Sequence, residues 1–318
     1  MINVHDEVVA AEARIRPYVR QTPLEYAFDL SAATQGRVYL KLENLQTTGS
    51  FKLRGALNKL LALDAAQRRR GIITASTGNH GLAVASALST LGMHGSIYLP
   101  ENASPQKIAM LRRYDVALKF HGYDGVEAER EARRVSEAEG RVYVSPYNDP
   151  QVIGGQGTVA VEVLQQVEGL DSVLVSVGGG GFIAGLAGYL KAVRPGVEVI
   201  GCLPQNSPVM YESIRAGHVV EMPSLPTLSD GTAGGIEADA ITFALCQRYV
   251  DGWVLVDEAA IGQGMKHLFE QHRLVVEGSA GVTVASFLRI KDRLAGKTVA
   301  LILCGGNVDI DQFKKLVC

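Results

Sequence analysis

The sequence predicts an α/β protein of two successive blocks, each built from parallel strands covered by helices. Short apolar runs alternate with segments of helical periodicity, which is the pattern of repeated strand–helix–strand units. The alternation restarts in the second half of the 318-residue chain, a length at which about two domains of roughly 150 residues are expected. The composition, 47% hydrophobic and 20% charged, is that of a globular protein and argues against disorder.

The first block is predicted to alternate three strands with three helices. The strands are expected at the apolar runs 72–75, 95–99 and 116–120. The helices are expected from Gly81 onward, from Pro105 onward and over the charged stretch 125–139. Because helical segments separate the strands, neighbouring strands are expected to be parallel.

The second block repeats this pattern. Strands are expected at 172–177, 197–202, 253–256 and 297–304, with a helix over 182–193. Residues 172–177 form a continuous apolar run, as expected for a strand covered on both faces. Two further stretches, 145–157 and 222–235, are interpreted as linkers.

Charge and cysteine content argue against several classes of protein. The chain has 31 Lys and Arg against 33 Asp and Glu, which gives no bulk attraction for nucleic acid or an anionic membrane. The uncharged run 172–190 is long enough to span a bilayer, but the four glycines within it favour a strand, a loop and a helix. The four cysteines are widely spaced, which favours a reducing cytoplasm over a disulfide framework.

Four consecutive glycines, Gly178–Gly181, follow the predicted strand 172–177 and precede a helix. Such a loop lets backbone N–H groups converge on an anion, and the helix N-terminus adds partial positive charge. We therefore favour a phosphate site, with a ligand-free tight turn as the alternative. The dinucleotide fingerprint fails in every frame, and Lys291 stands where a nucleoside-triphosphate loop would need its first glycine. A small phosphorylated cofactor remains.

Lys52 becomes the candidate anchor if that cofactor is pyridoxal phosphate, which needs a lysine amine for a Schiff base. Gly49 and Ser50 resemble the entry to a helix, with Ser50 as the expected N-cap. Lys52 then falls in the first turn, where the helix macrodipole lowers the pKa of its amine and favours the neutral form. The alternative for any single lysine is a solvated surface charge.

A second polar loop, residues 74–81 with the sequence TASTGNHG, follows strand 72–75 and opens a helix. Its hydroxyl, N–H and amide groups at a helix N-terminus suit a substrate carboxylate, and they belong to Ser76, Thr77, Gly78 and Asn79. An ordinary capping loop is the alternative.

Together these segments resemble the fold-type II pyridoxal-phosphate enzymes, and within them the threonine/serine dehydratase and serine racemase family. The matching motifs occur in the family's order between Lys41 and Asp309: KLENLQTTGSFKLRGA, ASTGNHG, SVGGGGFIAG and LILCGGNVD. The resemblance implies a tryptophan synthase β-like fold with parallel and mixed sheets covered by helices. It also implies a large cofactor-binding domain, residues 1–66 and 149–318, and a small substrate-binding domain, residues 67–148.

The resemblance also implies a role for each motif. Lys52 would hold the cofactor as a Schiff base, with Phe51 packed beside it. Asn79 would hydrogen-bond the ring hydroxyl, Gly178–Gly181 would bind the phosphate, and Cys304 would face the pyridine nitrogen as a neutral partner. The substrate carboxylate would be seated by Ser76, Thr77, Gly78, Asn79 and His80. A buried strand-end thiol for Cys304 and a local helix-start hydrogen bond for His80 are the open alternatives.

The implied reaction is β-elimination from a small 3-hydroxy amino acid, such as L-threonine or L-serine, to an α-keto acid and ammonia. The sequence Lys52-Leu53-Arg54 matches the dehydratases, in which the lysine removes the α-proton. Thr77 stands where racemases carry a Ser hydroxyl and many dehydratases an Ala, so a serine or amino-acid racemase with side elimination is the alternative. A cofactor-holding protein without catalysis, or a nucleotide-binding module, is a third hypothesis, against which the presence of Lys52 argues.

No metal is expected from the resemblance. Leu203 and Val209 stand where some family members have Glu and Asp ligands for a divalent cation, and apolar side chains cannot ligate it. A homodimer is typical of the family. Charged residues near the N-terminus interrupt any secretory signal, so a cytoplasmic location is expected. The resemblance implies a homodimer that binds a small amino-acid substrate.

Overall fold

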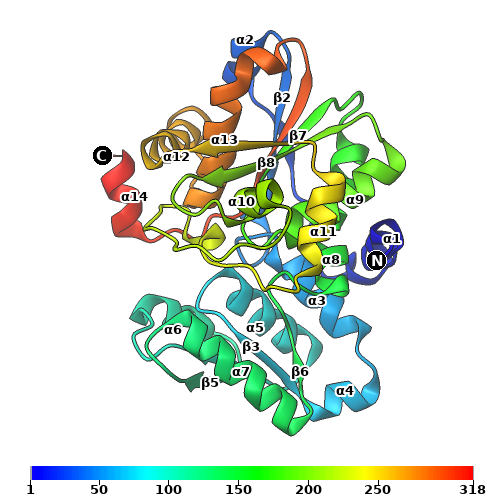
Figure 1. Cartoon of the computed structure of the whole chain (residues 1–318), viewed down its shortest axis with the longest axis vertical. Coiled ribbons are helices and arrows are strands. Elements are labelled where there is room, and N and C mark those ends of the chain that lie inside the picture. Colours follow the sequence, from blue (N-terminus) through cyan, green and yellow to red (C-terminus); the bar gives the residue numbers. More distant parts are fainter. Residues whose placement is uncertain (1, 318) are drawn as a thin grey trace.

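The structure, a computed structural model, describes residues 2–317 and contains two β-sheets covered by helices (Figure 1). This arrangement confirms the predicted α/β class. The larger sheet has the strand order β1-β2-β10-β7-β8-β9, and β1 pairs antiparallel to β2 while the other pairs are parallel. Its strands are β1 (Leu24–Tyr26), β2 (Arg37–Leu42), β7 (Ser172–Ser176), β8 (Glu198–Pro204), β9 (Gly252–Val256) and β10 (Thr298–Leu303).

Helices cover both faces of the larger sheet at its centre, since every residue of β7 and β10 is buried. This confirms the prediction made for residues 172–177. One helix, α13, packs along β7, β8, β9 and β10, while α8 packs against α1, α3 and α9. The helices of this part of the chain are α1 (Val4–Ile15), α2 (Phe28–Thr34), α3 (Lys52–Ala62), α8 (Pro150–Gln166), α9 (Gly181–Val193), α10 (Val209–Ala216), α11 (Ile241–Tyr249), α12 (Glu258–His272), α13 (Gly278–Ile290) and α14 (Ile310–Val317).

The smaller sheet is fully parallel and has the order β5-β4-β3-β6. Its two faces carry separate apolar clusters, because alternate strand residues point to opposite sides: Ile73 packs with α7 residues and Ile97 with α5 residues. The elements are α4 (Ala65–Arg70), β3 (Ile72–Ala75), α5 (Asn79–Leu91), β4 (Gly95–Leu99), α6 (Pro105–Leu111), β5 (Ala117–Phe120), α7 (Gly125–Glu139) and β6 (Val142–Tyr143). In Figure 1 this sheet lies below the larger one, with α3 and α8 between them.

The predicted linker at 145–157 is wrong over most of its length. Asp149 caps α8 by accepting hydrogen bonds from two backbone N–H groups, and Pro150 occupies the first turn, where it costs no hydrogen bond. The glycines that indicated a loop serve close helix packing instead. A Cβ at Gly155 would lie 2.6 Å from the Arg54 carbonyl oxygen of α3, and one at Gly157 would lie 2.8 Å from the Gly185 carbonyl oxygen of α9.

The second predicted linker, 222–235, contains one 3₁₀ turn, Asp230–Thr232, and otherwise neither helix nor strand. The uncharged run 172–190 is divided between β7, the glycine loop and α9, as expected. Over the part of the chain that the structure describes, every helix is too short or too polar to cross a membrane.

A buried ionic network fixes the beginning of α3. The Arg54 guanidinium donates to the Glu43 and Glu162 carboxylates, each at 2.7 Å, and Lys41 Nζ donates to Glu162 at 2.6 Å. All four side chains are fully buried. Burial lowers the pKa of Lys41, although Glu162 opposes that effect, and the two carboxylates hold the pKa of Arg54 above its ordinary value despite its burial. The network therefore ties α3, which carries Lys52, to β2 and α8.

Candidate active site

The candidate site lies where loops from both sheets meet at the carboxyl ends of their strands. In the larger sheet, β2, β7 and β10 are parallel, so the segments that follow them emerge at the same edge. These segments carry Lys52, Gly178–Gly181 and Asn307. The loop after β3 of the smaller sheet reaches them, because Asn79 Oδ1 accepts a 2.7 Å hydrogen bond from Asn307 Nδ2.

Lys52 is the first residue of α3, as predicted, and its side chain is half-buried. Its Nζ donates a 2.8 Å hydrogen bond to the Pro146 carbonyl oxygen. Loss of contact with water lowers the pKa of this amine to about 8, although the neighbouring Cys304 and Glu277 act in the opposite direction. The direction agrees with the sequence prediction, but desolvation is the leading cause rather than the helix dipole.

The expected N-cap is wrong: Phe51, not Ser50, occupies the N-cap position, and no side chain caps the helix. Ser50 instead forms a β-bridge with Gly305, and its buried Oγ has no hydrogen-bond partner. Phe51 stacks on Phe182 with ring centroids 4.0 Å apart, and the Lys52 amine lies 5.3 Å from the Phe51 centroid. This stack places Lys52 beside the first turn of α9, directly after the glycine loop.

The glycine loop joins β7 to α9 and keeps its amide groups free. Gly180 has φ +84°, a conformation that favours glycine, and a Cβ at Gly179 would lie 2.5 Å from the Tyr147 ring. The Gly179 carbonyl oxygen accepts from Thr242 Oγ1 at 2.7 Å. Within residues 2–317, no hydrogen bond uses the amide N–H groups of Gly178–Gly181. Four free N–H groups at a helix N-terminus provide donors for an anion.

The loop after β3 contains half-buried polar residues that can meet a ligand and a buried histidine that is bonded within the protein. Ser76, Thr77, Gly78 and Asn79 are half-buried, and Ser76 Oγ accepts from the Gly78 N–H at 3.1 Å. His80 is buried, and its Nε2 lies 2.9 Å from the Val144 carbonyl oxygen, which assigns the proton to Nε2. Burial, with the Lys52 charge second, lowers the pKa of His80 to about 3. Its neutral ring therefore offers no second N–H, and only its backbone is available to a carboxylate.

Asn79 is held in place by a buried carboxylate that the sequence did not single out for this role. Its Nδ2 donates to both Glu277 oxygens, at 3.0 and 2.9 Å. Burial raises the pKa of Glu277 to about 7, although the Asn79 hydrogen bond opposes the shift. Cys304 Sγ lies 3.7 Å from Glu277 Oε1, and burial raises the pKa of that thiol well above its ordinary value. The raised pKa favours the neutral thiol form of Cys304.

The sequence analysis did not identify Glu277, Asn307 and Pro146 as site residues. Asn307 belongs to the motif LILCGGNVD, and Glu277 is followed by Gly278. The structure gives a reason for that glycine, because any Cβ at Gly278 would collide with the Leu228 carbonyl oxygen. The partner of Lys52 could not be found from sequence, since Pro146 contributes only its backbone carbonyl.

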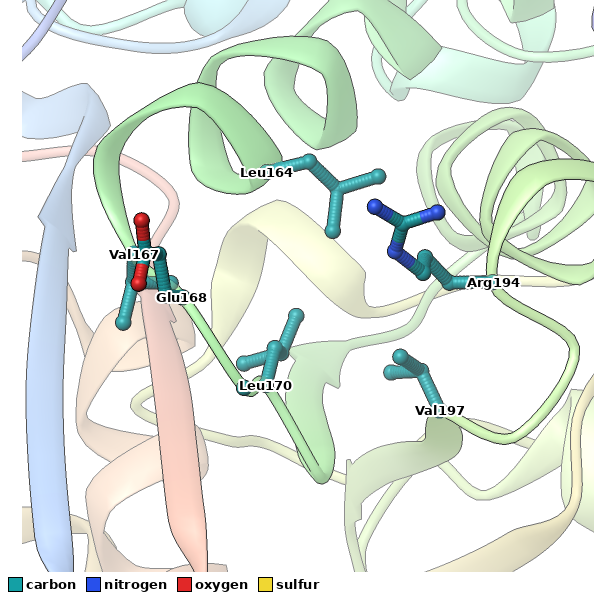
Figure 2. A pocket seen from close by; sticks show the side chains of 7 residues that line it. Leu164, Val167, Glu168, Leu170, Arg194 and Val197 are labelled. Atoms are coloured by element: carbon teal, nitrogen blue, oxygen red, sulfur yellow. The ribbon is translucent and has the colours of Figure 1, made fainter.

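The residues present fit pyridoxal phosphate. The free amides of Gly178–Gly181 suit its phosphate, Lys52 supplies an amine of lowered pKa, and Ser50 leaves a buried hydroxyl without a partner. A separate pocket of about 310 Å³ lies at the opposite edge of the larger sheet, in the segments that enter β7 and β8. Leu164, Leu170 and Arg194 line it (Figure 2), and none of the residues discussed above contributes to it.

Comparison with known proteins supports the same cofactor. The family model described as "Pyridoxal-phosphate dependent enzyme" matches residues 15–305. The L-threonine ammonia-lyase of Thermotoga maritima is 39% identical over 317 residues, covering 100% of this chain and 78% of that protein.

Two solved structures superpose over nearly the whole chain. The processed form of threonine deaminase isoform 2 from Solanum lycopersicum has a TM-score of 0.94 at 33% identity, covering 98% of this chain and 92% of that one. Maize serine racemase has a TM-score of 0.92 at 33% identity, with 98% and 95% covered.

Proposed function

Because the chain belongs to the family of pyridoxal-phosphate-dependent enzymes, we propose that it is an ammonia-lyase acting on L-threonine, L-serine or a related 3-hydroxy amino acid. Its products are an α-keto acid and ammonia. Full-length similarity to an L-threonine ammonia-lyase and to a threonine deaminase supports this reaction. The observation that carries the proposal is the position of the Lys52 amine, which lies over Phe51, the ring that stacks on Phe182 directly after a glycine loop with four free amides.

Each group of the site has a separate binding task. We assign the cofactor phosphate to the amides of Gly178–Gly181, the ring hydroxyl to Asn79 and the ring nitrogen to the Cys304 thiol. Lys52 holds the cofactor covalently in the resting enzyme. When bound, the cofactor withdraws electrons from the α-carbon of the substrate. Glu277 and Asn307 position Asn79 through hydrogen bonds from two sides.

Substrate binding falls to the loop after β3. Its backbone N–H groups at the N-terminus of α5, with the hydroxyls of Ser76 and Thr77, bind the substrate carboxylate. Lys52 Nζ then takes the α-proton, and a pKa of about 8 leaves a useful fraction of the amine neutral near physiological pH. The β-hydroxyl leaves with a proton, and hydrolysis of the remaining enamine gives the keto acid and ammonia.

Lys52→Ala tests this assignment, with Lys314→Ala as the matched control because Lys314 is exposed on α14. The Lys52 variant should lose the visible absorbance of the bound cofactor and release no keto acid from L-threonine or L-serine. The control should retain both. Keto-acid release by the Lys52 variant at the wild-type rate would rule out the proposal.

Amino-acid racemisation is the second candidate, favoured by one observation. Thr77 retains a hydroxyl in the half-buried loop after β3, and the fold closely matches a serine racemase. Chiral analysis of residual serine, measured alongside keto-acid release, separates the two activities. Racemisation faster than elimination would make the racemase the main activity.

The remaining expectations are proposals of the same kind. We propose a cytoplasmic homodimer, in line with the family resemblance, which light scattering on the holoprotein would test. The division into residues 1–66 with 149–318 and residues 67–148 is supported by the two separate sheets, and one apolar cluster joins α3 to α5 across it. Movement of residues 67–148 toward the larger part on substrate binding would show as a change in small-angle X-ray scattering.

A further inference from the structure

A cluster of one carboxylate and two imidazoles lies outside the candidate active site. Asp29 is in the first turn of α2, while His267 and His272 are in the last turns of α12. Their ligand-type atoms all lie within 4.8 Å of one another. None of the three residues belongs to an element that carries a proposed cofactor or substrate residue, and in Figure 1 α2 lies at the far end of the molecule from α5.

The contacts within this cluster are close, but they are not aligned as hydrogen bonds. His267 Nε2 lies 2.6 Å from Asp29 Oδ2, and His272 Nε2 lies 3.0 Å from Asp29 Oδ1. Nevertheless both Nε2 atoms and Asp29 Oδ2 are buried atoms without a hydrogen-bond partner among the described residues. Three buried polar atoms that lack hydrogen-bond partners destabilise the folded state unless a ligand binds them.

A metal ion satisfies such a set of atoms. Two imidazole nitrogens and one carboxylate oxygen are the ligands that Zn²⁺ and neighbouring transition metals prefer, whereas Mg²⁺ and Ca²⁺ prefer oxygen alone. The two Nε2 atoms come from different turns of α12, and each lies close to a different oxygen of Asp29. We propose that Asp29, His267 and His272 bind a divalent transition-metal ion of the Zn²⁺ class.

The surroundings indicate what the ion does. The side chains of His272, His267 and Asp29 are 14%, 26% and 32% exposed, so the cluster lies close to the protein surface. The ion joins α2, near the β1–β2 edge of the larger sheet, to the end of α12, elements that are distant in sequence. We therefore expect the metal to stabilise this contact without changing keto-acid release, because no active-site element ligates it.

The double variant His267→Gln/His272→Gln tests the site in the holoprotein, with His94→Gln/His218→Gln as the matched control. The control also removes two imidazoles, both exposed and outside the cluster. After removal of metal with a chelator, Zn²⁺ is titrated in competition with a chromogenic chelator. Wild type and control should bind one equivalent at the same affinity. The cluster variant should lose at least about a hundredfold in affinity, since even outer-sphere changes at metal sites cost 10–100-fold.

Two further measurements keep the result clear if the double variant folds poorly. Asp29→Asn retains a polar side chain of the same size but removes the carboxylate, and it should also weaken Zn²⁺ binding. Co²⁺ bound to wild type should show the visible absorption of a tetrahedral site with nitrogen and oxygen ligands, and Mg²⁺ should not displace it. Zn²⁺ should raise the melting temperature of wild type and of the control, but not that of the cluster variant.

Three outcomes would overturn the proposal. These are no Zn²⁺ uptake by wild type, equal uptake by wild type and the cluster variant, or a Co²⁺ spectrum unchanged by Asp29→Asn. In each case the three residues form only a pair of histidine–aspartate contacts. The proposed lyase function is tested separately by keto-acid release of the Lys52→Ala variant, so failure of the metal proposal would not contradict it.

Discussion

Replacing Glu162 by Gln should remove the centre of the buried ionic network and destabilise the protein. The Glu162 carboxylate accepts from Lys41 Nζ at 2.6 Å and from Arg54 Nη1 at 2.7 Å, and it pairs with Arg16 at 2.8 Å. Burial would raise the pKa of Glu162, but Arg54 and Lys41 outweigh it and hold the pKa at about 2 instead of 4.5. That difference corresponds to about 3 kcal/mol of stability.

The pH dependence of this effect follows from its sign. Because the folded-state pKa is depressed, the stabilisation is complete above about pH 4.5 and is lost as the pH falls toward 2. A Gln amide also turns an N–H donor toward two cations, so the loss at pH 7 should be about 3 kcal/mol or more, as for other broken buried pairs.

Urea unfolding of the holoprotein at pH 7, followed by circular dichroism, measures this loss. Glu168→Gln is the matched control, because Glu168 is exposed just beyond the end of α8. The difference between wild type and Glu162→Gln should shrink as the pH is lowered toward 3. A loss below about 1 kcal/mol at pH 7, or one equal to that of the control, would refute the inference that this network stabilises α3.

Three further predictions concern the site. Recombination of the apoprotein with pyridoxal phosphate should accelerate as the pH rises and level off above about 8, as the Lys52 amine loses its proton; a rate independent of pH between 6 and 9 would contradict this. Gly179→Ala should weaken cofactor binding at least about tenfold, because its Cβ would lie 2.5 Å from the Tyr147 ring, whereas Gly196→Ala, with nothing within 4 Å, should not; fluorescence titration distinguishes them. Thr77→Ala should lower any racemisation at least about tenfold more than keto-acid release, since loss of the contact with the substrate carboxylate weakens both activities but only racemisation needs a hydroxyl on the second face; chiral chromatography would expose equal losses of both activities.

Most of the strands and helices were predictable, because their signals are local. The apolar run 172–177, the glycine loop after it and the helix from Gly181 onward are contiguous, so pattern alone located the loop at the edge of the sheet. The linker prediction at 145–157 failed for a tertiary reason. Glycines read as loop residues are there to let α8 approach α1, α3 and α9, and those contacts are not visible in a local window.

The site also has residues that local sequence motifs identify and residues that only the folded structure brings together. Lys52, Gly178–Gly181 and Asn79 carry chemistry that the sequence displays, whereas the residues that position them do so through contacts between distant segments. Glu277 accepts a hydrogen bond from Asn79, which lies 198 residues away in the sequence. Pro146 accepts one from Lys52 through its backbone carbonyl alone. The metal-type cluster escaped notice for the same reason, since Asp29 lies far from the two histidines in sequence and no ligand spacing links them.

Borohydride reduction of the untreated holoprotein, followed by peptide mass mapping, tests the Lys52 assignment most directly. Reduction should leave pyridoxyl phosphate on the peptide that contains Lys52, with fragment ions placing it on the Lys52 side chain. Modification of Lys41, Lys59 or any other lysine instead, or no modified peptide from a protein saturated with cofactor, would show that Lys52 does not hold pyridoxal phosphate.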